Sequence, residues 1–233
     1  MKIRCVIFNI EDVLYDSAVY MSTVRINAVR AMIEDGLPTD IETTYRVLEE
    51  IVKEYGPDYP KHFNELLKRL GLKWNPRVIA SGVIAYRETS MSNLKPYPDT
   101  IPTLLKLRDR GYKLAVISQG PAVKQWQKLI QLGLRHIFHL VIISEELGLE
   151  TLGPSLFEAV LDRLNIQPKE AVFIGNQIDP DIISANRTGV FSVRIRKGQY
   201  VAESLKEEAT PKFEINRLSD IFNVIEKIEA EED

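Results

Sequence analysis

The sequence predicts an α/β protein, with a parallel sheet wrapped by helices and a second, purely helical domain inserted into it. From residue 96 onward, short apolar runs rich in β-branched residues alternate with segments of helical periodicity. Such alternation is typical of strands joined by crossover helices. Residues 15–95 show apolar residues at 3.6-residue spacing and no strand bounded by turns. We therefore expect a Rossmann-like core with an inserted α-helical cap.

Five runs are nearly continuous in apolar residues, as strands buried on both faces of a sheet should be. They are residues 4–8, 113–118, 139–144, 171–175 and 190–195. The first run precedes the insert and the others follow it, so the sheet must combine distant parts of the chain. The predicted core domain comprises residues 1–14 and 96–233, and the predicted cap domain comprises residues 15–95.

Glycines and capping residues mark the ends of the expected helices. In the core we expect helices over residues 99–111, 121–133, 155–164, 180–189 and 218–233. Three of them end at a glycine, the residue that most readily adopts the left-handed conformation found after a helix. In the insert we expect helices over residues 17–35, 40–55, 59–70 and 76–91.

Charge and composition exclude several classes of protein. The formal net charge is −3, with acidic and basic residues interspersed, so no nucleic-acid-binding surface is indicated. No apolar stretch approaches the length of a membrane span, and the first residues lead directly into a strand. The single cysteine, Cys5, cannot form an internal disulfide, which fits a reducing compartment. We expect a cytoplasmic monomer or homodimer that binds neither nucleic acid nor membranes.

Polar residues follow the predicted strands at their carboxyl ends, where open α/β sheets bind ligands. They are Asn9, Glu11 and Asp12 after the first strand, Ser118, Gln119 and Gly120 after the second, and Asn176, Asp179 and Asp181 after the fourth. A hydroxyl followed by Gly120 and a helix start predicts outward-facing backbone N–H groups, which suit an oxyanion such as phosphate. We predict Ser118, Gln119 and Gly120 as phosphate-binding residues, and a small phosphorylated metabolite as ligand. Asp12 is expected to cap a turn.

These strand ends, the position of the insert and the segments "PYPDTIPTLLKLRDRGYKLAVIS" and "IGN…DPDIISANRTGV" resemble the haloacid dehalogenase (HAD) superfamily of aspartate-nucleophile phosphatases. The resemblance is to subfamily I, whose helical cap follows the first strand, and it spans essentially the whole chain. The segments "GPAVKQWQKLIQLGL" and "IISEELGLE" are most similar to archaeal members related to glyceraldehyde-3-phosphate phosphatase. The resemblance to the HAD superfamily implies that one Asp attacks phosphorus and that a second Asp two residues later acts as acid and base. It also implies that Mg²⁺ neutralises charge on the phosphoryl group.

Three catalytic positions implied by the resemblance carry other residues in this chain. Asn9 holds the place of the nucleophile, and its neutral amide is a poor nucleophile. Glu11 holds the acid/base position but is one methylene longer, and small geometric errors at such a position are costly. The phosphate-binding lysine falls on Thr151 in "TLGPSLF", which carries no charge. We predict Asn9, Glu11 and Thr151 as degenerate catalytic positions.

The implied metal site consists of Asn9, Glu11, Asn176 and Asp181. Mg²⁺ prefers hard oxygen ligands and usually binds through one or two carboxylates. Amides stand at two of these positions, and an amide carbonyl is a weak ligand. We therefore expect weak or absent Mg²⁺ binding.

Taken together, these residues predict a HAD phosphatase homologue with lost or severely reduced phosphohydrolase activity, which binds a phosphorylated small molecule or a partner. The alternative is a residual Mg²⁺-dependent hydrolase of small phosphomonoesters, which uses Glu11 as general base or acts after deamidation of Asn9. A dehalogenase needs the same carboxylate nucleophile and fails at the same residue. Arg25 of the insert is a candidate replacement for the missing positive charge.

Overall fold

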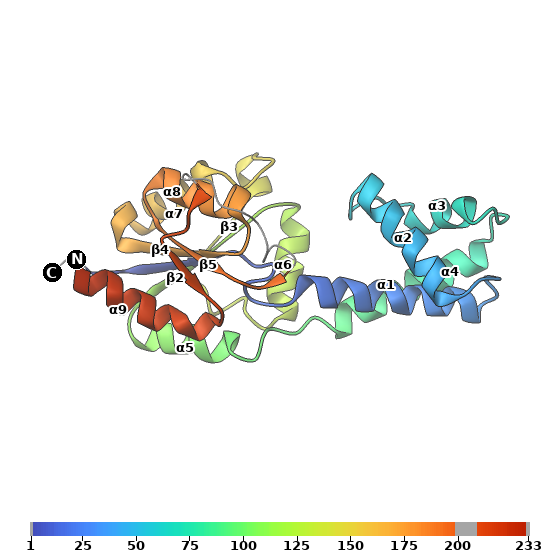
Figure 1. Cartoon of the computed structure of the whole chain (residues 1–233), viewed down its shortest axis with the longest axis horizontal. Coiled ribbons are helices and arrows are strands. Elements are labelled where there is room, and N and C mark those ends of the chain that lie inside the picture. The colour runs from blue at the N-terminus through green and yellow to red at the C-terminus, as the bar shows by residue number, and fades with distance from the viewer. Residues whose placement is uncertain (1, 199–208, 232–233) are drawn as a thin grey trace. The chain divides into compact units, whose positions relative to one another are not determined.

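One six-stranded sheet, parallel throughout, forms the centre of the protein (Figure 1). The computed structural model describes residues 2–198 and 209–231, and the strand order is β3-β2-β1-β4-β5-β6. The strands are β1 (Cys5–Phe8), β2 (Lys113–Ser118), β3 (Leu140–Ile143), β4 (Ala171–Gly175), β5 (Phe191–Ile195) and β6 (Phe213–Ile215). The predicted α/β fold class is confirmed.

Helices cover both faces of this sheet, with α7 and α8 on one side and α5 and α9 on the other in Figure 1. The core helices are α5 (Thr100–Asp109), α6 (Ala122–Gln131), α7 (Pro154–Leu164), α8 (Ile183–Thr188) and α9 (Ile221–Glu231). Short 3-10 helices are η1 (Ser144–Leu147), η2 (Pro168–Glu170) and η6 (Leu218–Asp220), and η3 (Ile178–Ile182) is a π-helical turn. Because both faces are covered, every residue of β1 and β4 is buried.

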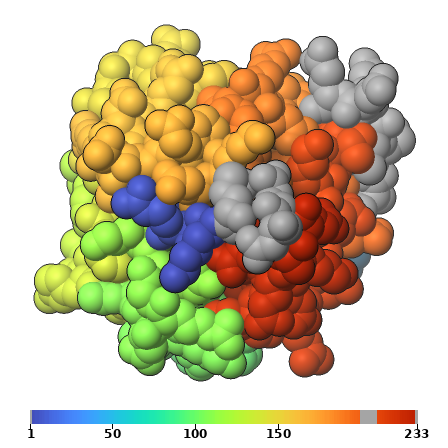
Figure 2. Space-filling model, turned by 90° about the vertical axis from the view of Figure 1, so that its left-hand side faces the viewer, coloured from blue at the N-terminus to red at the C-terminus, as the bar shows by residue number. Residues whose placement is uncertain are grey.

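The strands that flank β1 come from distant parts of the chain. Cys5 pairs with Lys113 of β2 on one side and with Ala171 of β4 on the other. Figure 2 shows this amino-terminal edge of the sheet, where the blue N-terminal segment lies between green and orange segments. The opposite, carboxyl edge of the same three strands therefore brings together the residues that follow β1, β2 and β4.

The chain divides into two compact units, residues 1–18 with 95–233 and residues 19–94. The predicted boundaries lay at residues 14 and 96. The second unit is built from α2 (Ile41–Tyr55), α3 (His62–Arg69), α4 (Pro76–Ser92) and most of α1 (Ser17–Glu34). It has a buried apolar cluster of its own, which includes Val29, Met32, Leu48, Ile51 and Leu66.

Two features of the core differ from the sequence-based expectation. Strand β6 was not predicted, and with three residues it is too short to show a periodicity. The helix expected over 180–189 begins as the π-helical turn η3, in which Asp181 is buried. Among the described residues, no helix combines the length and apolar character that crossing a membrane requires.

Candidate functional site

The side chain of Asn9, the first residue after β1, bridges to the loop that follows β4. Its Nδ2 donates to both carboxylate oxygens of Asp181, at 3.2 Å to Oδ1 and 3.1 Å to Oδ2. Its Oδ1 accepts the N–H of Ile10 at 2.7 Å. Asn9 and Asp181 are both buried. Both ends of the amide are therefore engaged, and Asn9 links two neighbouring strand ends.

Asp181 is held by several donors in a buried position. Besides Asn9, the backbone N–H groups of Asn176 and Gln177 donate to its Oδ2 at 3.1 and 3.3 Å. Burial raises the pKa of Asp181 to about 6, although the hydrogen bonds from Asn9 and the backbone act in the opposite direction. A Cβ at Gly175 would lie 2.5 Å from Oδ2 of Asp181, so the position of the Asp181 carboxylate requires glycine at residue 175.

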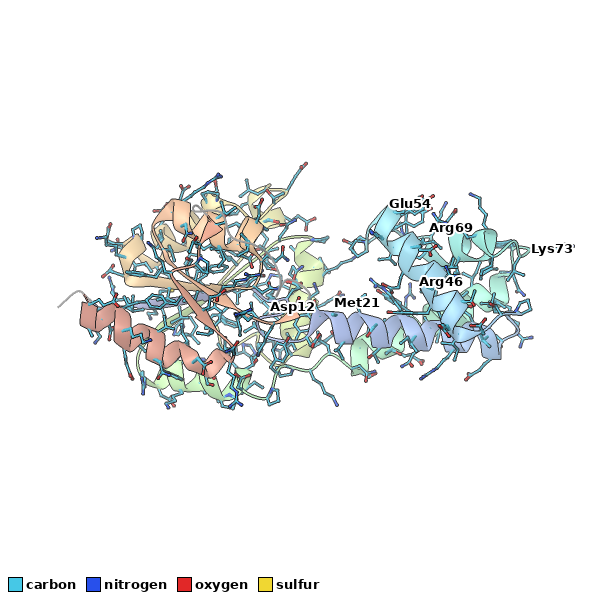
Figure 3. The ribbon with its side chains drawn as sticks, in the orientation of Figure 1. Asp12, Met21, Arg46, Glu54, Arg69 and Lys73 are labelled. Carbon is cyan, nitrogen blue, oxygen red and sulfur yellow. The ribbon has the colours of Figure 1, made fainter. Side chains whose placement is uncertain are left out.

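Asp12 connects the turn after β1 to both α1 and Asn176. It has a positive φ of 56°, and it lies in the loop between β1 and the start of α1 (Figure 3). Its Oδ1 accepts the N–H of Ser17 at 2.9 Å, in line with the predicted capping role. Its Oδ2 accepts from Nδ2 of Asn176 at 3.3 Å, a contact that was not predicted.

Glu11 is ion-paired with Lys128 of α6. Nζ of Lys128 also donates to Oε1 of Gln125 at 3.4 Å. The side chains of Glu11 and Lys128 are 28% and 26% exposed. Nothing in the sequence relates Lys128 to Glu11, which lies 117 residues away. Lys128 is thus a site residue that sequence reasoning missed.

Ser118 is fully buried at the end of β2, and within the described part of the chain its Oγ has no hydrogen-bond partner. The backbone N–H of Gly120 donates to Oγ of Ser144 at 3.1 Å, and that of Ala122 donates to Oε2 of Glu145 at 2.7 Å. Both N–H groups are thus hydrogen-bonded within the protein, and phosphate binding by Ser118, Gln119 and Gly120 stays a prediction. Side chains that follow β3 satisfy these donors at the start of α6.

Gln119 and Thr151 lie on neighbouring loops. Oε1 of Gln119 accepts the N–H of Leu152 at 3.1 Å. Thr151 itself is exposed in the bend before α7. Thr151 stands where the resemblance implies a lysine. The hydrogen bond from its neighbour Leu152 therefore connects this position to the loop that follows Ser118.

The predicted metal-binding residues come together only in part. Asn9, Asn176 and Asp181 form one hydrogen-bonded cluster, whereas Glu11 is paired with Lys128 and Asp179 is exposed. Among residues 2–198 and 209–231, no group of three or more His, Cys, Asp or Glu side chains could hold a metal ion. The N–H donors of Asn9, Asn176 and Gln177 occupy the Asp181 carboxylate, so this arrangement does not fit a resident Mg²⁺. Weak Mg²⁺ binding stays a prediction.

Asn176 contributes the other unsatisfied buried group. Its Oδ1 is buried and, like Oγ of Ser118, has no hydrogen-bond partner among the described residues. Buried polar atoms in folded proteins are nearly always hydrogen-bonded, so each exception needs an explanation. An acceptor after β4 and a hydroxyl after β2 are both left for a ligand or for solvent.

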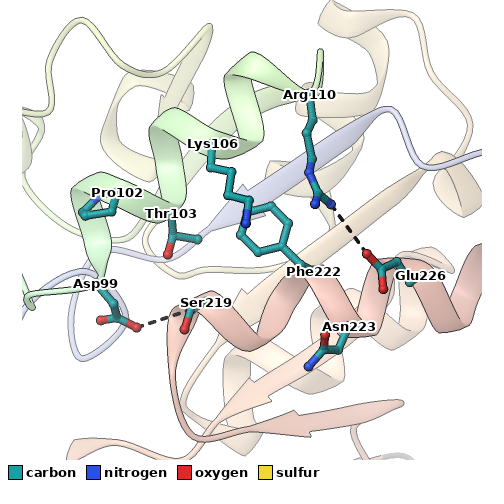
Figure 4. Close-up of a pocket in the computed structure, with 9 residues that line it drawn as sticks. All are labelled: Asp99, Pro102, Thr103, Lys106, Arg110, Ser219, Phe222, Asn223 and Glu226. Carbon is teal, nitrogen blue, oxygen red and sulfur yellow. Dashed lines mark hydrogen bonds and ion pairs between the residues drawn. The ribbon is translucent and has the colours of Figure 1, made fainter.

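A separate hollow of about 410 Å³ lies between α5 and α9 (Figure 4). Nζ of Lys106 and Cζ of Arg110 lie 4.7 and 4.6 Å from the ring centroid of Phe222, and Arg110 pairs with Glu226 at 3.7 Å. None of its lining residues is a predicted site residue.

In the second unit, Arg25 donates to both carboxylate oxygens of Glu49, at 2.9 and 3.0 Å.

A family model decides the relationship that the strand ends suggest. The haloacid dehalogenase-like hydrolase family matches residues 3–189, which is most of the chain. The protein belongs to this family. A protein named glyceraldehyde 3-phosphate phosphatase from Methanopyrus kandleri is 47% identical over 229 residues, covering 97% of this chain and 98% of its own length. One of the same name from Methanocaldococcus jannaschii is 36% identical and covers 98% of this chain and all of its own length.

Solved structures of HAD proteins share the fold. A haloacid dehalogenase-like family hydrolase from Xanthomonas campestris has a TM-score of 0.71 at 17% identity, covering 99% of this chain and 97% of its own. The L-2-haloacid dehalogenase RSc1362 has a TM-score of 0.69 at 16% identity, covering 97% of this chain and 100% of its own. The predicted HAD relationship is thus confirmed by sequence and by fold.

Proposed function

We propose that this HAD protein binds small phosphomonoesters at the carboxyl edge of its sheet and hydrolyses them slowly. The observation that carries the proposal is the contact between Asn9 and Asp181. A neutral amide stands where the family's carboxylate nucleophile is expected, and its N–H₂ group is directed at the neighbouring carboxylate.

The proposed ligand class has two supports. The relatives from Methanopyrus kandleri and Methanocaldococcus jannaschii, which match nearly the whole chain, carry the name glyceraldehyde 3-phosphate phosphatase. In addition, Oγ of Ser118, which can donate to a phosphate oxygen, is buried without a partner among the residues described here. A hydroxyl at the end of a parallel strand is suited to a phosphate oxygen.

The proposed slow rate follows from the chemistry of an amide. Covalent phosphoryl transfer needs a strong nucleophile, and the Asn9 amide is a weak one because its nitrogen lone pair is delocalised and the group carries no negative charge. Losses within a set of residues that act as one unit are strongly non-additive, so the first removal causes most of the damage. The absence of a lysine at Thr151 then adds little further loss of rate.

A working hydrolase of small phosphomonoesters is the second candidate. The names of the relatives favour it over loss of activity. Glu11 would then act as general base on a water molecule, which typically contributes about 10²- to 10⁴-fold in rate. Mg²⁺ would be the cofactor in this case, in keeping with the family, and the N–H donors of Asn9, Asn176 and Gln177 would have to leave the Asp181 carboxylate before the ion could bind there.

Binding and turnover of glyceraldehyde 3-phosphate, measured separately, distinguish these candidates. Calorimetry gives the affinity, and phosphate release with and without Mg²⁺ gives the rate for the wild type, Asn9→Ala and the exposed control Asn223→Ala. Peptide mass mapping verifies that Asn9 is not deamidated. Binding with slow release that Asn9→Ala leaves unchanged supports the main proposal. Rapid release by the wild type overturns it and supports the second candidate, whether or not Asn9→Ala abolishes the release, and absence of binding overturns both.

A further inference from the structure

The charges of the candidate site raise a problem for any phosphate ligand. Acidic side chains follow both β1 and β4, among them Glu11, Asp12, Asp179 and Asp181. The expected lysine position carries Thr151, and the arrangement does not fit a resident Mg²⁺. A phosphate dianion would meet carboxylates with no cation of the family's usual kind to balance them. A phosphate site here therefore needs a positive charge from another element.

Lys128 is placed to supply that charge. Its ammonium group pairs with Glu11, two residues from Asn9. It also contacts Gln125, whose Nε2 donates to the backbone carbonyl of Gln119 at 2.9 Å. Gln119 directly follows Ser118, and its own side chain accepts from the N–H of Leu152, next to Thr151. The hydrogen-bonded chain from Lys128 thus reaches both the Ser118 loop and the loop that lacks the lysine.

Two other positively charged side chains of the core, Lys197 and Arg194, interact with other groups. Lys197 lies over the ring of Tyr97, 3.7 Å from its centroid, and its Nζ is 3.8 Å from Asp99. Nε of Arg194 donates to the backbone carbonyl of Asn176 at 3.3 Å, and its side chain is only 3% exposed. Arg194 therefore supports the loop after β4 from within the core.

The Glu11–Lys128 pair can exchange partners at low cost. Each side chain is about a quarter exposed, and ion pairs of this kind contribute little to stability. A lysine ammonium is a point charge on a flexible stem that can turn from a carboxylate to a phosphate. Resting on the proposed function, we propose that Lys128 contacts the phosphate of the ligand in place of the lysine absent at position 151. Glu11 holds the ammonium group until the ligand arrives.

Titration with inorganic phosphate by calorimetry tests this role. The variants are Lys128→Met, Glu11→Gln and their combination, with Lys124→Met as the matched control, because Lys124 is an exposed lysine of the same helix. We expect Lys128→Met to raise the dissociation constant about tenfold or more, as loss of a charge-assisted contact should, and Lys124→Met to raise it less than about twofold. Glu11→Gln should tighten binding, and the combined variant should lose that gain.

Each outcome bears on one proposal or both. Equal weakening by Lys128→Met and Lys124→Met, or a gain from Glu11→Gln that persists without Lys128, would show a general charge effect and overturn the role of Lys128. Lys128→Arg keeps the charge and should bind within a few-fold of the wild type. Circular dichroism verifies that each variant is folded. A wild type that binds neither inorganic phosphate nor glyceraldehyde 3-phosphate overturns the proposed function and this inference together.

Discussion

The contact between Asn9 and Asp181 needs no metal ion to balance its charge. Two buried carboxylates at this distance would repel each other, and a cation would have to separate them. An amide instead donates to the carboxylate at 3.1 and 3.2 Å and adds no charge. An amide at position 9, where the resemblance implies a carboxylate, therefore changes the charge balance of the cluster as well as the nucleophile.

The buried Asp181 carboxyl should make stability depend on pH. Its pKa is raised from 3.8 to about 6 by burial, so the folded state binds the proton more tightly than the unfolded state. The stabilisation from its protonated form is fully present below about pH 3.8 and is lost as pH rises through about 6. Its size is about 3 kcal/mol, by the usual conversion of a pKa change into free energy.

Asp181→Asn removes this titration with little change of shape. The free energy of unfolding of the variant minus that of the wild type should rise by about 3 kcal/mol as the pH increases from 4 to 7. Urea unfolding of both proteins across that range measures the difference, in which the other carboxyl groups cancel. A difference that is constant with pH would contradict the raised pKa.

At the scale of elements, the apolar runs predicted the buried strands well. Residues 113–118 and 171–175 were predicted as strands and are β2 and β4 with the same bounds. Both are buried on two faces, so their composition alone identifies them. The short edge strand β6 and the π-helical turn η3 carry no such signal.

The contacts within the candidate site were harder to predict than the strands. The order of strands brings Asn9, Ser118 and Asn176 to one edge, which sequence reasoning anticipated. It could not anticipate the pairing of Glu11 with Lys128, which are 117 residues apart, because that contact depends on how α6 packs beside the loop after β1. Nor could it anticipate that Ser144 would occupy the N–H of Gly120.

Close packing of α1 against α4 predicts whether an added methyl group at Gly82 stabilises or destabilises the protein. A Cβ added at Gly82 of α4 would lie 2.7 Å from Cγ and 2.8 Å from Sδ of Met32, which is fully buried. Alanine in a helix interior gains about 1 kcal/mol over glycine, whereas overpacking costs about 1–3 kcal/mol. Gly82→Ala should therefore destabilise the protein by roughly 1 kcal/mol in thermal or urea unfolding.

A double-mutant cycle separates the two effects. In a Met32→Ala background the clash is absent, so the same Gly82→Ala change should be neutral or stabilising. If Gly82→Ala stabilises the protein even with Met32 present, Met32 has room to move and the packing argument is wrong.

At the scale of the whole molecule, the chain keeps the architecture of its family, and the predicted differences in chemistry lie at one edge of the sheet. The family model matches residues 3–189, and the core and the inserted unit each have a buried apolar cluster. The departures that the resemblance implies, at Asn9, Glu11, Thr151 and Asn176, lie at strand ends and in loops. Strand packing and strand-end chemistry depend on different residues, so a change in the second need not disturb the first.

Together with the proposed slow rate, that separation predicts how hydrolysis can be accelerated. Asn9→Asp alone should change hydrolysis of glyceraldehyde 3-phosphate less than about threefold, because the new carboxylate faces Asp181 without a cation and no lysine stands at Thr151. Adding Thr151→Lys and Asn176→Asp supplies a phosphate contact and a further oxygen ligand, and the triple variant should gain at least about 10²-fold over Asn9→Asp in the presence of Mg²⁺.

Phosphate release under identical conditions measures both variants, and the matched control carries Thr151→Lys and Asn176→Asp with Asn9 retained. That control should stay as slow as the wild type, since no carboxylate is available to attack phosphorus. Rapid hydrolysis by Asn9→Asp alone would mean that the remaining positions are already competent. Rapid hydrolysis by the control would mean that the reaction proceeds without a nucleophile at position 9, through a water molecule activated elsewhere in the site.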